Sequence, residues 1–229
     1  MDPELSDNWT EEELRAAVEA YVHMHSDEAN GIPFVKKKIY SDLADRFGRT
    51  EKSFEYRMQN ISYVYSLMGR EWVSGLKPAK NVGANNAALI ERIISEVEGQ
   101  SLQKVAEFET QVISYKSKAN LSKPDGFKEP EKTYSQITSF SRDPKVKAWV
   151  LKEADGICEC CGSGAPFTTA EGEPFLEVHH LRRLADGGSD TVENAVALCP
   201  NCHREMHYGI NKSVLVSSMY KKLSRLARE

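Results

Sequence analysis

The sequence contains no apolar run long enough to cross a membrane. A membrane-spanning helix needs about 20 consecutive apolar residues, whereas 28% of these 229 residues are charged and lie along the whole chain. The amino terminus begins Met-Asp-Pro-Glu, which is acidic where a secretory signal would be basic and then apolar. We therefore expect no membrane segment and no signal peptide, and predict a cytoplasmic protein.

Cysteine is absent from the first two thirds of the chain, and the sequence has no overall excess of positive charge. All five cysteines lie in the last third: Cys158, Cys160, Cys161, Cys199 and Cys202. In a cytoplasmic chain such clustering indicates metal ligands and not disulfides. The net charge of -4 argues against a protein that coats nucleic acid without selectivity. Residues 36–80 nevertheless carry ten lysines and arginines against five acids, a local net charge of +5.

The first hundred residues show helical periodicity. Thr10 is followed three residues later by Glu13, the pattern of a capping box at the start of a helix. A second helical run ends at Gly48, and a third begins at Arg49-Thr50 with apolar residues on one face: Phe54, Met58, Ile61, Val64 and Leu67. Helix, short turn and basic helix is the order found in helix-turn-helix DNA readers, and also in many small bundles that bind no DNA.

The length of the chain suits one large domain or two small ones, and we expect two. We expect a loop over residues 69–86 and a helix over 87–97. Residues 118–133 are rich in lysine, proline, serine and glutamate, a composition typical of linkers. The predicted organisation is a helical head domain over residues 1–100, a linker over 101–140 and a second domain over 141–229.

Two cysteine pairs in the second domain have the spacing of zinc knuckles. They are Cys158-x-x-Cys161 and Cys199-x-x-Cys202. Four thiolates close a tetrahedral site completely, so we predict a structural Zn²⁺ whose removal unfolds the domain. Cys160 lies between two predicted ligands and could replace Cys161, although the C-x-x-C spacing favours Cys161. The alternative interpretation is a group of buried free cysteines.

Histidines lie between and after these knuckles in a strand, loop, strand and helix pattern. An apolar run over residues 175–181 ends in His179 and His180, a second run covers 194–198, and a helix is expected from residue 200. His203 and His207 are four residues apart, so on a helix both imidazoles lie on the same side. Two ligands on the helix and one or two on the facing strand can hold one metal ion.

The order His179-His180, Asn194, His203 and His207 resembles the motif of HNH (ββα-metal) nucleases. Residues 142–144, 156–158, 176–180 and 199–205 are similar to those of McrA-like modification-dependent restriction endonucleases, and the four histidines are similar to those of nuclease colicins. The resemblance implies an α+β protein, in which a mainly helical amino-terminal domain is joined by a linker to a small zinc-stapled ββα-metal (HNH) domain.

The same resemblance implies a role for each residue of the motif. His180 is expected to be the general base that activates water, and Asn194 to tie down the loop and orient His180. His179, His203 and His207 are expected to bind the catalytic divalent cation, which is Mg²⁺, Mn²⁺, Co²⁺, Ni²⁺ or Zn²⁺. The implied activity is hydrolysis of DNA phosphodiester bonds that leaves 5′ phosphates, in restriction of foreign or modified DNA.

The expected partner is double-stranded DNA, modified or unmodified. The head domain resembles that of some McrA-like endonucleases over residues 47–50, 55–61 and 75–79. Basic residues of both domains are candidates for DNA contacts, although solvation explains exposed arginines equally well: Arg49, Lys52, Arg57, Lys77, Lys80, Arg182, Arg183 and Arg204. The alternatives are a non-catalytic zinc-dependent DNA-binding regulatory protein and a mobile-element homing nuclease.

A homodimer is also predicted, because one ββα site cuts one strand and a double-strand break needs two sites related by the symmetry of the duplex. A carboxy-terminal apolar run at helical spacing offers a surface for it: Val214, Leu215, Met219, Leu223 and Leu226. The other interpretation of this run is a helix that packs back on the zinc domain.

Overall fold

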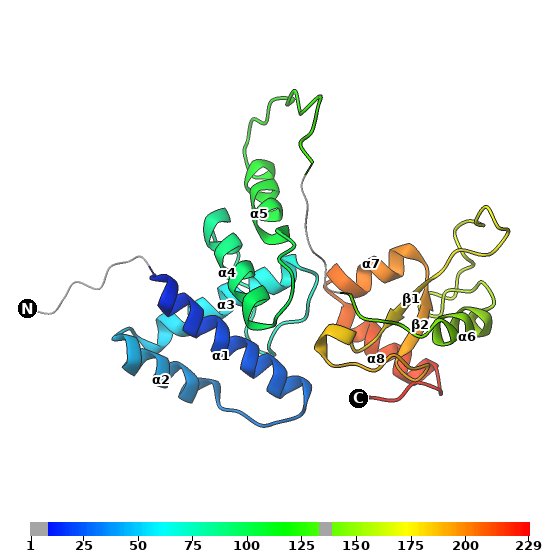
Figure 1. The fold of residues 1–229 in the computed structure, drawn as a ribbon, viewed down its shortest axis with the longest axis horizontal. Coiled ribbons are helices and arrows are strands. Elements are labelled where there is room, and N and C mark those ends of the chain that lie inside the picture. The colour runs from blue at the N-terminus through cyan, green and yellow to red at the C-terminus, as the bar shows by residue number, and fades with distance from the viewer. Residues whose placement is uncertain (1–8, 133–138) are drawn as a thin grey trace, which may run out of the picture. The chain divides into compact units, whose positions relative to one another are not determined.

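A computed structural model describes residues 9–132 and 139–229 (Figure 1). The chain divides into two compact units, residues 1–138 and 139–229. Residues 1–8, on which the expectation of no signal peptide rests, and residues 133–138 of the predicted linker lie outside the described ranges. Within those ranges, no helix is both long enough and apolar enough to span a bilayer.

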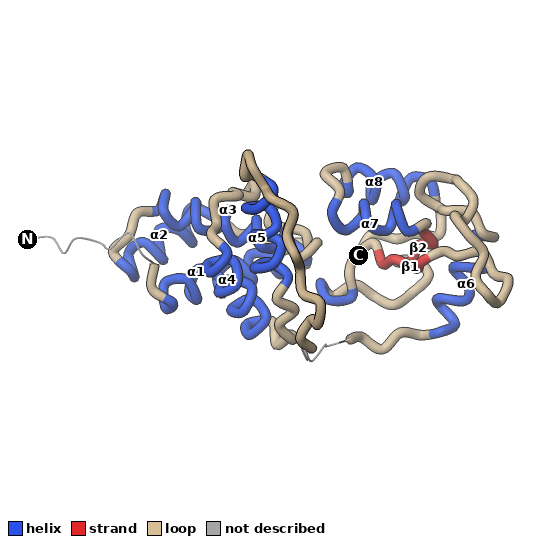
Figure 2. The backbone as a smooth tube through the Cα atoms, turned by 90° about the horizontal axis from the view of Figure 1, so that it is seen from above, coloured by secondary structure: helices blue, strands red, loops and turns tan. Residues whose placement is uncertain are grey.

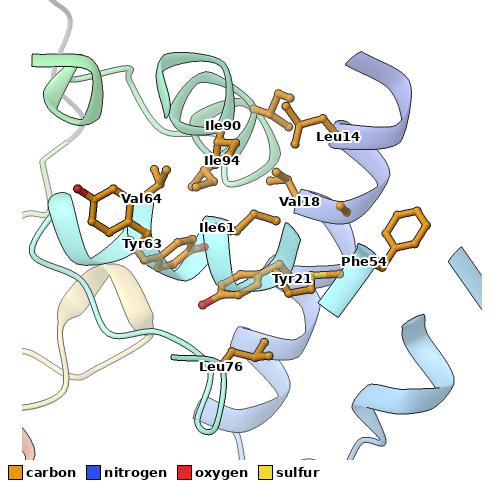
Figure 3. Close-up of a cluster of buried hydrophobic side chains, with 14 of the residues drawn as sticks. Leu14, Val18, Tyr21, Phe54, Ile61, Tyr63, Val64, Leu76, Ile90 and Ile94 are labelled. Carbon is orange, nitrogen blue, oxygen red and sulfur yellow. The ribbon is translucent and has the colours of Figure 1, made fainter. Parts of the chain in front are cut away.

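The first unit is a helical bundle. Its helices are α1 (Glu11–Ala29), α2 (Lys36–Phe47), α3 (Glu51–Leu67), α4 (Ala84–Val97) and α5 (Val105–Lys116). The centre of the bundle is formed by apolar side chains of α1, α3 and α4 that are almost completely buried (Figure 3): Leu14, Val18, Ile61, Val64, Ile90 and Ile94. The apolar periodicity in the sequence therefore reports the buried face of each helix.

The predicted start of α1, the end of α2 at Gly48 and the start of α3 at Thr50 are confirmed. Both hydrogen bonds of the capping box are present, with Glu13 N donating to Thr10 Oγ1 and Thr10 N donating to the Glu13 carboxylate. Gly48 ends α2 with a φ of 69°, a left-handed conformation that glycine adopts without steric cost. Helix α4 begins at Ala84, three residues before the predicted start.

Helix α5 lies inside the range predicted to be a linker. The carboxylate of Glu91, which is completely buried in α4, accepts hydrogen bonds from Val105 N at 2.9 Å and Ala106 N at 2.7 Å. A carboxylate from another helix thus satisfies the free N–H groups at the start of α5. This contact spans fourteen residues or more, so the local composition of residues 101–116 did not indicate it. Residues 117–132 contain no helix or strand, as their composition indicated.

The second unit has the predicted ββα arrangement. It contains α6 (Pro144–Ala154), β1 (Glu177–His180), the short 3-10 helix η1 (Leu184–Asp186), β2 (Ala195–Leu198), α7 (Pro200–Tyr208) and α8 (Lys212–Lys222). Strands β1 and β2 pair antiparallel, with Glu177 opposite Leu198 and His180 opposite Ala195. Helices α6 and α7 both contact this hairpin (Figure 2). The α+β class with a ββα unit is confirmed.

Helix α8 packs back on the second unit, which decides between the two interpretations of the carboxy-terminal apolar run. Met219 is completely buried, and Leu215, Leu223 and Leu226 pack against the same core. Of the five residues, Val214 alone is largely exposed, at 66%. This packing favours the interpretation of a helix that packs back on the zinc domain, and the homodimer stays a prediction.

Candidate active site

The four predicted cysteine ligands form one cluster. Their Sγ atoms lie within 4.8 Å of one another. Cys199 is the N-cap of α7 and Cys202 lies in its first turn, so α7 supplies one pair, and Cys158 and Cys161 supply the other. Cys199 N also donates a hydrogen bond to Cys158 Sγ at 3.2 Å. Cys160 is not a member of the cluster.

The chemistry of the cysteine cluster fits a metal ion. Hydrogen bonds from the backbone and side chain of Ser163 lower the pKa of Cys161 to about 6, so this thiol ionises readily. Burial raises the pKa of Cys158 and Cys202 above the ordinary value of a thiol. A bound cation would compensate the charge of these buried thiolates. Four sulfur donors form a closed ligand set, as structural sites do.

Three histidines form a second cluster. His179 on β1 faces His203 and His207 on α7, and one ring nitrogen of each lies within 4.8 Å of the others. The Nε2 atoms of His203 and His207 are 3.2 Å apart. Burial, followed by the proximity of His207 and His203, lowers the pKa of His179 to about 2. His179 is therefore neutral near pH 7 and has a ring lone pair for a cation.

His180 lies on the other face of β1 from His179, because consecutive side chains of a strand point to opposite faces. Its Nε2 atom lies 2.7 Å from Oδ1 of Asp190, and only 6% of its side chain is exposed. The opposite carboxylate oxygen of Asp190 accepts a hydrogen bond from Asp143 N at 2.5 Å. A carboxylate thus holds the buried imidazole of His180.

Asn194 ties down the loop between the two strands. Its Oδ1 accepts from Arg182 N, and its Nδ2 donates to the carbonyls of Arg182 and Ser189, all at 2.8 Å. Asn194 is completely buried. Within the described residues its side chain makes no hydrogen bond to His180, whose polar partner is Asp190.

Two carboxylates of this site were missed by the sequence analysis. Glu177 Oε2 lies 2.9 Å from His203 Nδ1, and Asp190 contacts His180. Glu177 could have been found, since it precedes His179 by two residues and so lies on the same face of the strand. Asp190 lies in an irregular loop, where no periodicity indicates the direction of a side chain.

Comparison with known proteins agrees with this geometry. Residues 158–209 match the family model for HNH endonucleases, a range that includes both cysteine pairs and all four histidines. The type IV methyl-directed restriction enzyme EcoKMcrA of Escherichia coli (strain K12) is 47% identical over 220 residues, which are 90% of this chain and 75% of that protein. The chain belongs to the family of McrA restriction endonucleases.

A solved structure is also similar to this McrA-family endonuclease. It is that of ScoMcrA, a type IV phosphorothioation-dependent restriction endonuclease, with 40% sequence identity and a TM-score of 0.34. The match covers 37% of this chain and 19% of ScoMcrA. The similarity is thus limited to a part of each protein.

Two arginines that were predicted to contact DNA have contacts inside the head of this McrA-family endonuclease. Arg49 pairs with Glu13, with Nε 2.5 Å from Oε1 and both side chains about nine-tenths buried. Arg49 and Arg57 both lie over the ring of Trp9, 4.7 and 4.4 Å from its centroid. These contacts stabilise the start of α1 against α3.

The other predicted DNA contacts differ in their exposure. Lys52, Lys77, Lys80 and Arg204 are exposed. Arg182 and Arg183 are half-buried, with Arg182 Nε donating to the carbonyl of Asp186 at 3.1 Å. In this McrA-family endonuclease Arg204 follows His203 on α7.

Proposed function

We propose that this McrA-family endonuclease hydrolyses phosphodiester bonds of modified double-stranded DNA at the three-histidine cluster. The observation that carries the proposal is the convergence of His179, His203 and His207, with His180 following His179 on β1. The relationship to EcoKMcrA, whose name describes a methyl-directed enzyme, supports methylated DNA as the substrate class. We expect a single strand to be cut by each site, leaving a 5′ phosphate.

The two clusters suit different ions. His179, His203 and His207 would hold a divalent cation, and three protein ligands would leave it able to bind a phosphate oxygen. Mg²⁺, Mn²⁺, Co²⁺, Ni²⁺ and Zn²⁺ are candidates. Such a cation supplies electrostatic stabilisation of the charge that develops on the phosphate. The closed set of four cysteines suits a structural Zn²⁺.

His180 is the proposed general base. It takes a proton from the attacking water as the oxygen bonds to phosphorus, and the 3′ oxygen leaves. Asn194 holds the loop that follows His180, and the exposed Arg204 is a proposed contact to a backbone phosphate.

The helical head is the proposed specificity module, because a ββα site contacts the DNA backbone and distinguishes sequences poorly. Lys52, Lys77 and Lys80 are its exposed candidates for DNA contacts, and Arg49 and Arg57 are left out because of their contacts with Trp9 and Glu13.

A homodimer on DNA remains part of the proposal, with a surface other than the apolar face of α8. Sedimentation with and without duplex, with a nicking assay on supercoiled plasmid, tests it: a monomer that yields only nicked circles contradicts the dimer.

The experiment that tests the function is digestion of matched DNAs that are unmodified, methylated, hydroxymethylated or phosphorothioated, each with Mg²⁺, Mn²⁺, Co²⁺ or Ni²⁺. Cleavage of methylated DNA in preference to unmodified DNA is expected. Binding of modified DNA without cleavage under every cation would instead support a non-catalytic DNA-binding protein.

A variant with the proposed base removed provides the second half of the test. His180→Ala should abolish cleavage and leave zinc content and DNA affinity near those of the original protein, since a base acts in the transition state. Cleavage by this variant at the original rate would show that His180 is not the base.

A further inference from the structure

The His180–Asp190 contact determines which ring nitrogen of His180 carries a proton. Hydrogen bonds from Asp143 N and His180 keep the pKa of Asp190 below its usual value although burial acts to raise it, so its carboxylate is ionised near pH 7. An ionised carboxylate only accepts hydrogen bonds. The Nε2 atom of His180, 2.7 Å away, must therefore be the donor. No hydrogen bond reaches Nδ1 from any residue that the structure describes.

We propose that Asp190 is a positioning residue that holds the His180 ring in the tautomer with its proton on Nε2, so that Nδ1 is the atom that accepts the proton of water. The inference rests on the proposed role of His180 as the base. It also gives Asn194 an indirect part in catalysis, through the loop that carries Asp190.

The loop is built to place Asp190 accurately. Asn194 donates to the carbonyl of Ser189, the residue before Asp190. Gly187 has a φ of 80°, and a Cβ atom at Gly188 would lie 2.1 Å from the carbonyl oxygen of Arg182. Side chains at these two positions are therefore excluded by the path of the backbone. A fixed loop lets one carboxylate define the orientation of a ring ten residues away.

Asp190→Ala tests the inference. At saturating DNA and cation, the single-turnover cleavage rate should fall about 10–100-fold, the usual effect of losing a carboxylate partner of a functional histidine. The dissociation constant for a methylated duplex should stay within about twofold, because the orientation of a base affects the chemical step and not the binding of DNA. An unchanged rate would overturn the inference.

The two single variants distinguish a failure of the positioning role from a failure of the proposed base. A fully active His180→Ala variant contradicts the proposed base, whereas an inactive His180→Ala with a fully active Asp190→Ala contradicts the positioning role alone.

Asp143→Ala is the matched control for stability. It removes the N-cap of α6, whose carboxylate accepts from Lys145 N at 2.8 Å, but keeps the backbone N–H that reaches Asp190. It should cost about 1 kcal/mol of stability and lower the cleavage rate far less than Asp190→Ala does, because the N–H donor to Asp190 is retained. A loss of rate equal to that of Asp190→Ala would show that destabilisation of α6 explains both.

The tautomer itself is observable from the ¹⁵N chemical shifts of the His180 ring in the cation-loaded protein, assigned by comparison with His180→Ala. In the original protein we expect a protonated Nε2 and an unprotonated Nδ1 at a pH where the ring is neutral. In Asp190→Ala we expect a mixture of both tautomers. The proton on Nδ1 in the original protein, or the same single tautomer in the variant, would overturn the proposal.

Discussion

Glu177 Oε2 lies 2.9 Å from His203 Nδ1, and the Nε2 atom of the same ring lies 3.2 Å from Nε2 of His207. The two ring nitrogens of His203 therefore have different contacts: Nδ1 faces a carboxylate, and Nε2 faces the other histidine of α7. A carboxylate on Nδ1 fixes the ring orientation and keeps the lone pair on Nε2, which is the arrangement that a metal-binding histidine needs. In the proposed function, strand β1 thus supplies both a cation ligand, His179, and the carboxylate that orients a second proposed ligand on α7.

The first prediction is that Glu177→Ala weakens binding of the catalytic cation by about 10–100-fold, measured by calorimetry with Mn²⁺. Cleavage at low cation concentration should fall and should recover as the concentration is raised. Glu173→Ala is a suitable control, since this exposed carboxylate lies before β1. An unchanged affinity in Glu177→Ala would show that His203 needs no such partner.

The second prediction concerns the cysteine cluster. Cys199→Ser should release the zinc and expose the core of the second unit, since the free energy of metal binding contributes to folding. Cys160→Ser is the matched control, because Cys160 lies between two ligands but outside the cluster, and it should keep one zinc per chain. Zinc content by mass spectrometry and thermal unfolding are the measurements. Stoichiometric zinc in a soluble, active Cys199→Ser would contradict the ligand assignment.

The third prediction follows from the packing of α8. Met219→Glu should unfold the second unit or lower its stability by several kcal/mol, because an unpaired charge would replace a completely buried side chain. Val214→Glu, at a position that is 66% exposed, should change stability by less than about 0.5 kcal/mol. A stable Met219→Glu that nicks DNA and no longer cuts both strands would instead place this helix in a dimer interface.

The fourth prediction concerns how the stability of the helical head depends on pH. The hydrogen bond from Arg49, with those from Thr10, keeps the pKa of Glu13 below its usual 4.5 although burial acts to raise it. A carboxyl with a lowered pKa in the folded state stabilises the fold above its unfolded pKa, and this stability is lost as the pH falls through the folded value. Glu13→Gln should therefore flatten the loss of stability below about pH 4.5.

At pH 7 the same variant should be less stable by roughly 1–3 kcal/mol, because Arg49 loses its charged partner. Glu12→Gln is the control, since the side chain of Glu12 is 75% exposed and its ion pair with Arg46 is long, at 3.4 Å. Denaturant unfolding of both variants from pH 3 to 7 measures the effect. Parallel pH profiles for Glu13→Gln and the original protein would contradict it.

The fifth prediction concerns which fragments of the chain fold by themselves. A fragment of residues 139–229 should fold, bind zinc and cleave DNA with little preference for modification, because both clusters lie within it. A head fragment that ends at residue 100 should be less stable than one that ends at residue 132, because it loses α5 and leaves the Glu91 carboxylate buried without its two N–H donors. Thermal unfolding of the two head fragments and digestion by the nuclease fragment are the measurements. Equal stability of the two head fragments would contradict the role of α5.

The sequence alone determined the features that depend on spacing. Helical periodicity, the Thr10–Glu13 capping box and the stop at Gly48 predicted the first three helices, since each is set by contacts within four residues. The two C-x-x-C pairs and the four-residue spacing of His203 and His207 predicted both clusters, because ligands of one metal ion must occupy fixed positions on a turn or a helix. The resemblance to HNH nucleases then connected these clusters with a reaction.

Tertiary structure decided what depends on contacts between distant segments. Glu91 of α4 accepts hydrogen bonds from the first N–H groups of α5, and Asp190 of an irregular loop contacts His180. Neither contact follows a period that can be read along the chain. The contacts of the basic residues could not be predicted from the sequence for the same reason. Arg49 has the positive charge expected of a DNA contact. Only the positions of Glu13 and Trp9 show that its guanidinium is already paired within the helical head. A sequence specifies which groups are available, and the fold decides which of them are already paired.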